Sequence, residues 1–171
     1  MIEFPLVTER LLLRPLEAAD EEELHETLAH PTTLAAIGHD GPWTRAATRS
    51  SIERRGAHQR RYGFAMWGVA ERESGALVGI CGLQMLEGGP EVEVGWHMHP
   101  AVRGRGYAPE AGRAALDAGF GTLGLQRVVA VTDPGNASSR RVMEKLGMTL
   151  VGPGRHYGGV TVVYELTGGS G

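Results

Sequence analysis

The stretch Pro90–Arg113 constrains the fold most, because it reads as a strand, a glycine-containing loop and a helix in direct succession. Residues 91–99 alternate between apolar and polar side chains, which is the period of a β-strand with two different faces. The apolar face carries Val92, Val94, Trp96 and Met98, and the polar face carries Glu91, Glu93, Gly95, His97 and His99. A proline follows at position 100 and cannot donate to a sheet, so the strand is predicted to end there.

The loop at residues 103–108 contains two glycines and two arginines and leads directly into the helix. The first N–H groups of a helix have no partner inside it, and the helix dipole adds partial positive charge there. Gly104 and Gly106 have no Cβ, so a phosphate can reach the backbone. Arg103 and Arg105 add charge and hydrogen-bond donors. The loop is therefore predicted to bind an anion.

Composition narrows the class of protein. The chain has 171 residues and a net charge of −3, which suits one domain and disfavours nucleic acid as the main partner. The first ten residues lack a signal-peptide core, and no apolar run is long enough to span a membrane. We therefore expect a cytoplasmic protein that does not engage a membrane. One domain over residues 1–166 and a flexible tail over 167–171 are expected.

Periodicity and turn residues predict the order β-α-α-β-β-β-α-β-α-β-β, which is an α/β fold of the α+β kind. The predicted strands cover residues 8–16, 64–70, 76–84, 91–99, 127–132, 149–151 and 160–166. The predicted helices run from Glu21 to before Pro31, from Thr44 to about Arg61, from the glycine loop to Gly121–Gly124, and from Ser138 to Leu146. Residues 32–42 and 152–159 are expected to be loops. The sheet is expected to be mixed but mostly antiparallel, with helices on both faces.

Three segments in this order resemble one family. Arg103, Gly106 and Ala108 fit the pattern Arg/Gln-x-x-Gly-x-Gly/Ala of the acyl-CoA pyrophosphate loop in the GNAT acetyltransferase superfamily. Residues 8–16, TERLLLRPL, resemble the start of the Rim-type branch, the ribosomal-protein N-terminal acetyltransferases. Residues 136–148 resemble the Asn-x-x-Ser and Glu-Lys-x-Gly-Phe segment of that branch, with methionine in place of the usual aromatic residue.

This resemblance implies a sheet splayed between its fourth and fifth strands, here residues 91–99 and 127–132, with the pantetheine arm of acetyl-CoA in the gap. It implies direct transfer of an acetyl group to a primary amine in a ternary complex, without an acyl-enzyme. Cys81, the one cysteine, is then not required as a nucleophile and is expected to be a small buried side chain.

The resemblance also assigns roles to individual residues. Backbone groups of His97 and Met98 are expected to bind the pantetheine amides, and Asn136 is expected to meet the same arm. The pyrophosphate is expected on the N–H groups of Arg103, Gly104, Arg105, Gly106, Tyr107 and Ala108. Ser139 is expected near the thioester sulfur.

Two candidate catalytic residues each have a competing role. Glu93 is the candidate general base, acting through water, because amine acylation requires a deprotonated amine. Its competing role is to bind the substrate ammonium or an arginine without taking a proton. Ser139 is the candidate acid toward the leaving thiolate, and its competing role is to cap its own helix.

The acceptor amine is not specified by any motif. From the fold that the resemblance implies, the residues expected to face the thioester are Ile37, His39, Trp43, Trp67, Gln84 and Tyr157. The aromatic residues among them fit a core or a dimer surface equally well, and a homodimer is possible. Both a protein N-terminus and a small-molecule amine fit as the acceptor.

Three other interpretations stay open. The chain fits a non-catalytic acyl-CoA-binding or regulatory module that kept the loop, or an acyltransferase with a longer donor such as succinyl-CoA. A nucleotide-binding protein with the same glycine loop is also considered, although Pro109 stands where a dinucleotide fingerprint has its third glycine. The pair His97 and His99 shares a strand face, but no third metal ligand can be placed.

Overall fold

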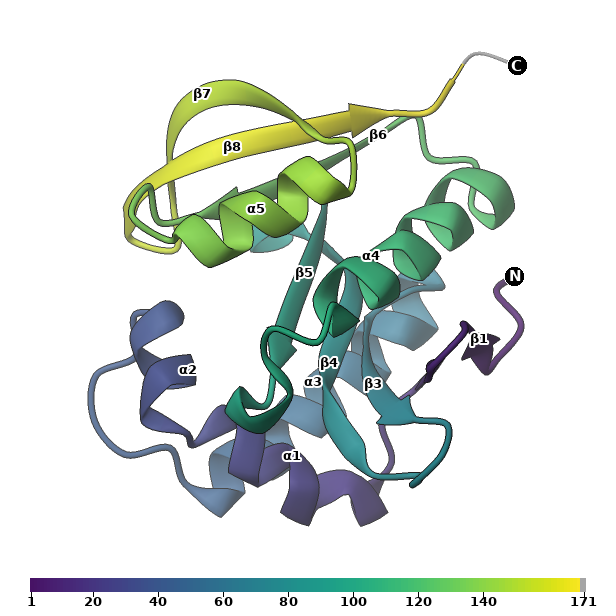
Figure 1. Cartoon of the computed structure of the whole chain (residues 1–171), viewed down its shortest axis with the longest axis vertical. Coiled ribbons are helices and arrows are strands. Elements are labelled where there is room, and N and C mark those ends of the chain that lie inside the picture. Colours follow the sequence, from purple (N-terminus) through teal and green to yellow (C-terminus); the bar gives the residue numbers. More distant parts are fainter. Residues whose placement is uncertain (170–171) are drawn as a thin grey trace.

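The computed structural model describes residues 1–169 and shows one eight-stranded sheet with helices on both faces (Figure 1). The strands are β1 (Leu6–Val7), β2 (Leu11–Arg14), β3 (Met66–Glu71), β4 (Leu77–Met85), β5 (Val92–Met98), β6 (Arg127–Thr132), β7 (Thr149–His156) and β8 (Gly159–Thr167). The α-helices are α1 (Glu21–Leu28), α2 (Pro31–Ala36), α3 (Arg45–Tyr62), α4 (Tyr107–Asp117) and α5 (Ala137–Lys145). Short 3-10 turns are η1 (Ala18–Asp20), η2 (Leu86–Gly88) and η3 (Pro100–Val102), and a π-helical turn, η4 (Ala118–Thr122), extends α4.

The strand order in the sheet is β1-β2-β3-β4-β5-β6-β8-β7. Neighbouring strands are antiparallel except β5 and β6, which are parallel and paired only at Glu93 and Val129. Beyond this pair the two strands diverge, and Figure 1 shows β6, β7 and β8 leaving the plane of β3, β4 and β5. The predicted fold class and the predicted splay are therefore confirmed, with the fourth and fifth predicted strands corresponding to β5 and β6.

Each face of the sheet buries a separate apolar cluster. On one face α4 and α5 pack over a large core that includes Leu83, Leu116 and Met143, all nearly inaccessible to solvent. On the other face α1 and α3 cover a smaller cluster that includes Leu24 and Ile80. Because side chains alternate along a strand, the two faces of β5 look toward different helices.

The predicted first strand over residues 8–16 is wrong at its start. Residues 8–10 form the turn between β1 and β2, because the Thr8 N–H and the Leu11 carbonyl close it over 2.9 Å. The Thr8 hydroxyl adds hydrogen bonds to the backbone of Leu11. This turn adds β1 to the predicted order, and it places Arg10 beside the start of α4.

Two predicted loops contain regular structure. Residues 31–36 form α2, because a proline is well suited to the first position of a helix and the His30 side chain accepts the N–H of Thr32. Residues 152–156 belong to β7, in which a bulge near Gly152 precedes a proline. Proline is tolerated there because β7 is the edge strand of the sheet.

The chain terminus differs slightly from the predicted tail. Strand β8 continues to Thr167, and the Gly168 N–H donates to the Gln126 carbonyl over 2.9 Å, so the ordered part runs past residue 166. Residues 170 and 171 of the predicted tail lie outside the described residues. Over residues 1–169, none of the helices has both the length and the apolar character needed to cross a bilayer.

Candidate active site

A cavity of about 910 Å³ opens where β5 and β6 diverge. Its wall is formed by α2, β5, the glycine loop, the first turns of α4 and α5, and the β7–β8 hairpin. Of the residues predicted for the site, the wall includes Ile37, Gln84, Glu93, His97, Met98, Arg103, Gly104, Gly106, Tyr107, Ala108, Asn136, Ser139 and Tyr157. The structure thus brings most of the predicted site residues to one cavity.

The glycine loop presents several free backbone donors. Gly104 and Gly106 both have a φ of 80°, a left-handed conformation that favours glycine, and Gly106 is the residue directly before α4. The N–H groups of Arg103 and Arg105 donate to carbonyls of η3, so the prediction that they bind the pyrophosphate is wrong for these two residues. Within residues 1–169, no backbone acceptor is found for the N–H groups of Gly104, Gly106, Tyr107 or Ala108. Unpaired donors at the positive end of a helix dipole form an anion site.

The two loop arginines differ in where their side chains point. Arg103 lies on the cavity wall and donates from Nη1 to the Thr32 hydroxyl over 2.9 Å, which joins the loop to α2. Arg105 is not part of the wall, because its guanidinium donates to Glu71 on β3 over 3.0 Å. The expected contribution of the Arg105 side chain to anion binding is therefore not supported by its position.

Along β5, the backbone N–H and C=O groups of every second residue point toward the gap between β5 and β6. The His99 N–H donates to the Val78 carbonyl on the β4 side, over 2.8 Å. Because the direction alternates along an antiparallel strand, His97 also points its backbone groups toward β4, whereas Met98 and Trp96 point theirs toward β6. The predicted contact of the His97 backbone with the pantetheine amides is therefore wrong, because these groups face β4. The His97 side chain lines the cavity instead, and burial near Arg55 and Arg103 lowers its pKa to about 4. His97 is therefore a neutral imidazole at neutral pH.

The first turn of α5 lies at the same gap. The Asn136 side chain accepts the Ser139 N–H over 3.0 Å and so caps the helix. Capping by Ser139, its competing role, is wrong for this chain, because Ser139 lies inside the first turn. Its side chain is on the cavity wall, and no hydrogen bond of its hydroxyl is found within residues 1–169. The hydroxyl is thus placed to meet a bound molecule.

Glu93 is a buried carboxylate on the cavity wall, with 4% of its surface exposed. Gln84 lies directly opposite on β4 and donates from Nε2 to Oε1 of Glu93 over 2.5 Å, and the Tyr157 hydroxyl donates to the same oxygen. Burial raises the pKa of Glu93 above its usual value, although the two donors oppose the shift. A carboxylate with a raised pKa takes up a proton more readily at neutral pH.

Tyr157 is held over Glu93 by an unusual pair of backbone conformations. Tyr157 and Glu87 have φ values of 54° and 48°, and within residues 1–169 they are the non-glycine residues with positive φ. The two are in contact, because the Tyr157 N–H donates to the Glu87 carboxylate over 2.7 Å. Burial and the bond to Glu93 raise the pKa of Tyr157, so its hydroxyl remains protonated. Strain of this kind is concentrated at functional sites.

Three residues predicted for the acceptor site lie elsewhere. Trp67 is fully buried in the main core and donates its indole N–H to Gln59, so its predicted role is wrong. Trp43 packs against the smaller core and donates to Thr48, while His39 stacks edge-on against it with ring centres 5.1 Å apart. Neither is part of the cavity wall. The sequence does not single out His156 and Thr161 of the β7–β8 hairpin, which also line the cavity, or Glu87, which holds the Tyr157 backbone.

Cys81 and His99 both have structural surroundings. Cys81 is fully buried and unpaired, and burial raises its thiol pKa, so it is a core side chain as expected. His99 accepts the Ala101 N–H and caps η3. In the described part of the chain, no group of three or more His, Cys, Asp or Glu side chains is arranged to hold a metal ion.

A splayed sheet with an anion loop at its opening is the arrangement expected of an acyl-CoA-dependent transferase. The sequence pattern of the family described as acetyltransferase (GNAT) domain matches residues 10–149. The chain belongs to this family and is an acetyltransferase. Members of the family use acetyl-CoA as co-substrate.

Similar proteins span nearly the whole chain. It is 32% identical to the uncharacterized protein YkkB of Bacillus subtilis (strain 168), over 94% of each chain. It is 28% identical to the uncharacterized N-acetyltransferase YnaD of the same organism, over 84% of this chain and 81% of YnaD. A GNAT-family acetyltransferase structure from Bacillus anthracis superimposes with a TM-score of 0.81 at 30% identity, covering 94% of this chain and 96% of that one.

The Rim-type branch receives support at the level of fold only. The structure of RimL, a ribosomal L7/L12 α-N-protein acetyltransferase in complex with coenzyme A, has a TM-score of 0.80 and 19% identity, covering 96% of this chain and 98% of that one. At that identity the likeness establishes a shared fold and carries no information about the acceptor.

The raised pKa of Glu93 predicts a pH-dependent penalty in stability. Because the folded state holds this proton more tightly than the unfolded chain, the free energy of unfolding falls as pH rises from the usual glutamate pKa through the raised one. We predict that Glu93→Gln removes this penalty, so that the urea midpoint of the variant exceeds that of the wild type at about pH 8 and matches it near pH 4, around the usual glutamate pKa.

The matched control is Glu91→Gln, which changes an exposed carboxylate just before the same strand and should give no gain at pH 8. A lower midpoint for Glu93→Gln than for the wild type at pH 8 would show that the ionised carboxylate is stabilised in the folded protein.

Proposed function

We propose that this protein transfers the acetyl group of acetyl-CoA directly to a primary amine, with both substrates bound together. The observation that carries the proposal is the common cavity. Within residues 1–169, four backbone N–H groups between Gly104 and Ala108 have no backbone acceptor, and their residues line the same space of about 910 Å³ as the buried carboxylate of Glu93. An anion-binding end and a proton-accepting end in one cavity fit an acyl-CoA donor and an amine acceptor.

The donor end fits the polar parts of acetyl-CoA. The N–H groups of Gly104, Gly106, Tyr107 and Ala108 would hold the pyrophosphate, as the chemistry of the donor set suggests. The backbone groups of Met98 that face the gap would pair with the pantetheine amides, and the Asn136 side chain on the same cavity wall would meet the same arm. Bound acetyl-CoA supplies a thioester, which is an activated acyl group.

The acceptor end is suited to remove a proton from an amine. Glu93 has a raised pKa, which brings a carboxylate closer to the working pH of a general base. Gln84 and Tyr157 fix one of its oxygens, so the other remains for a water or for the amine. Holding the amine in line with the acyl group supplies much of the expected acceleration.

The proton for the leaving thiolate is assigned to Ser139. Its hydroxyl lies on the cavity wall at the N-terminal turn of α5, where the helix dipole favours negative charge. Direct transfer requires no acyl-enzyme, which agrees with the fully buried position of Cys81.

The acceptor is an amine presented near Ile37, Gln84 and Tyr157. A protein N-terminus, as in the Rim-type enzymes, and a small-molecule amine both fit this description. The fold shared with RimL favours neither, so an acceptor panel should contain peptides and small amines. A non-catalytic acyl-CoA module and a longer acyl donor such as succinyl-CoA are the alternatives, and thiol release measured with each donor separates them. A homodimer is tested independently, by the mass of the protein in solution.

The donor assignment is tested by thermal unfolding with acetyl-CoA, CoA, ATP and NAD in parallel. A ligand that binds only the folded state adds about 2.7 kcal/mol at roughly 100 times its dissociation constant. We predict an increase in Tm with both CoA species. A shift with ATP or NAD alone would contradict the donor assignment, and binding of CoA without thiol release from any amine would indicate a binding module.

Replacement of Glu93 tests the proposed base. We predict that Glu93→Gln lowers kcat roughly 100-fold near neutral pH, within the usual range for a general base, and less at high pH where the amine loses its proton unaided. CoA affinity should not change, and Glu91→Gln should behave like the wild type. A raised KM for the amine with an unchanged kcat would instead mean that Glu93 only binds the ammonium.

Replacement of Gly106 tests the loop. We predict that Gly106→Ala weakens CoA binding roughly tenfold or more, because φ is 80° and the new Cβ meets Nη2 of Arg10 at 3.3 Å. Gly63→Ala is a matched control, since φ is 81° at the end of α3 and no atom lies within 4 Å. The control should lose similar stability in urea and keep its CoA affinity by calorimetry. Equal CoA affinity in both variants would remove the loop from the site.

A further inference from the structure

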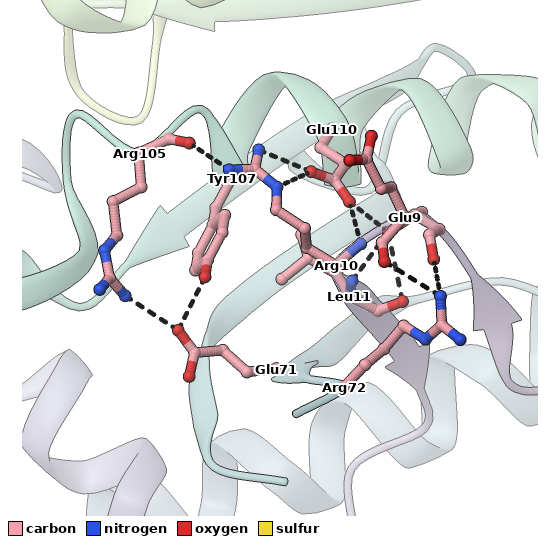
Figure 2. Close-up of polar contacts among 9 residues, drawn as sticks. Glu9, Arg10, Leu11, Glu71, Arg72, Arg105, Tyr107 and Glu110 are labelled. Carbon is pink, nitrogen blue, oxygen red and sulfur yellow. Dashed lines mark hydrogen bonds and ion pairs between the residues drawn. The ribbon is translucent and has the colours of Figure 1, made fainter. Parts of the chain in front are cut away.

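The turn between β1 and β2 contacts the glycine loop on the side away from the cavity. Figure 2 shows Arg10, in this turn, lying between Arg105 of the loop and Glu110 of α4. Arg10 donates from Nη1 to the Arg105 carbonyl over 2.8 Å and from Nε to Oε2 of Glu110 over 2.7 Å. Residues about a hundred positions apart in the sequence are thereby joined.

Both carboxylate oxygens of Glu110 accept hydrogen bonds from residues of the β1–β2 turn. Its Oε1 accepts the Thr8 hydroxyl over 2.6 Å and the backbone N–H of Arg10 over 2.8 Å, while Oε2 pairs with the guanidinium. Partial burial opposes ionisation, but these hydrogen bonds lower the pKa of Glu110. The carboxylate is therefore charged and holds Arg10 in a defined place, although Arg10 is 43% exposed.

A second set of contacts anchors the neighbouring residues. The Tyr107 hydroxyl and Nη1 of Arg105 both donate to Oε1 of Glu71, over 2.8 and 3.0 Å (Figure 2). The guanidinium of Arg10 lies 4.8 Å from the centre of the Tyr107 ring. Arg72 donates to the carbonyls of the β1–β2 turn, which holds that turn in place. The β1–β2 turn, strand β3 and the start of α4 thus hold the glycine loop in place.

The bond from Arg10 to the Arg105 carbonyl has a geometric consequence. In a planar trans peptide the C=O and the next N–H point in opposite directions. Fixing the Arg105 carbonyl toward Arg10 therefore directs the Gly106 N–H away from Arg10. The position of a Cβ at Gly106, 3.3 Å from Nη2 of Arg10, agrees with close packing on that side. A cation on the carbonyl also polarises the peptide and strengthens its N–H as a donor.

We propose that Arg10 is a positioning residue for the donor site: by holding the Arg105 carbonyl it orients the Gly106 N–H and so sets the affinity for the pyrophosphate of the co-substrate. This inference rests on the proposed use of acetyl-CoA. It gives the Thr-Glu-Arg opening of the chain a role in co-substrate binding that neither the cavity wall nor the loop sequence reveals.

The experiment compares Arg10→Lys and Arg10→Gln with the wild type. Lysine keeps a charge for Glu110 but lacks the planar fork that reaches two acceptors at once. The matched control is Arg45→Lys, which alters an exposed arginine that binds both oxygens of Glu22 outside the cavity wall. Each protein is measured for KM and kcat with acetyl-CoA, for inhibition by inorganic pyrophosphate and by pantetheine, and for its urea midpoint.

We expect both Arg10 variants to raise KM for acetyl-CoA roughly 5- to 20-fold, the effect of one exposed charge-assisted hydrogen bond. Inhibition by pyrophosphate should weaken by a similar factor, while inhibition by pantetheine, kcat and the KM for the amine should stay within about twofold, well below that effect. Arg45→Lys should leave all of these values unchanged. This pattern of results would mean that Arg10 contributes to binding of the pyrophosphate and not to binding of the pantetheine arm or the amine.

Several results would overturn the inference. An unchanged KM in Arg10→Lys, or equal losses for pyrophosphate and pantetheine, would make Arg10 a purely structural residue. Arg10→Lys keeps the ion pair with Glu110, so the inference can still be tested if Arg10→Gln fails to fold. A wild-type protein that fails to bind CoA would refute the proposed function itself, which is a different result from wild-type binding with unaffected variants.

Discussion

The single parallel pairing of Glu93 with Val129 is the constraint on which the site depends. It joins the two parts of the sheet at one point and lets β5 and β6 separate beyond it. If the strands paired along their full length, the backbone groups of Met98 would be satisfied inside the sheet and the gap would close. The same residue, Glu93, also supplies the buried carboxylate that we propose as the general base, so the opening of the sheet and this carboxylate share one position.

Much of this arrangement could be predicted from the sequence, because its determinants are local. Alternation defined β5, an apolar run defined β6, and a turn with glycine and asparagine preceded α5. The glycines at 104 and 106 have the left-handed conformation that a loop of this kind requires. Periodicity and turn chemistry act over a few residues, so they are visible in the sequence.

The rest could not be predicted because it depends on contacts between distant residues. Trp67 could not be separated from a site residue, since only the packing against Phe4 and Gln59 shows that it is core. Residues 32–42 and 152–159 are expected to be loops, whereas Pro31 begins α2 and Pro153 lies in an edge strand. The reach of Arg10 to a carbonyl 95 positions later has no sequence signature at all.

The charges around the loop are largely neutralised within the protein. Arg10 pairs with Glu110 and Arg105 with Glu71, and within residues 1–169 only Arg103 of this group lacks a carboxylate partner. An anion at the loop therefore meets peptide dipoles at contact distance more than a concentrated positive field. Dipole attraction declines steeply with distance, so it acts mainly on an anion that is in contact with the loop. Coulomb attraction between full charges reaches further, is screened by salt, and draws back an ion that is leaving. In the proposed function, a loop built this way would hold a highly charged co-substrate at contact and still release the spent thiol between turnovers.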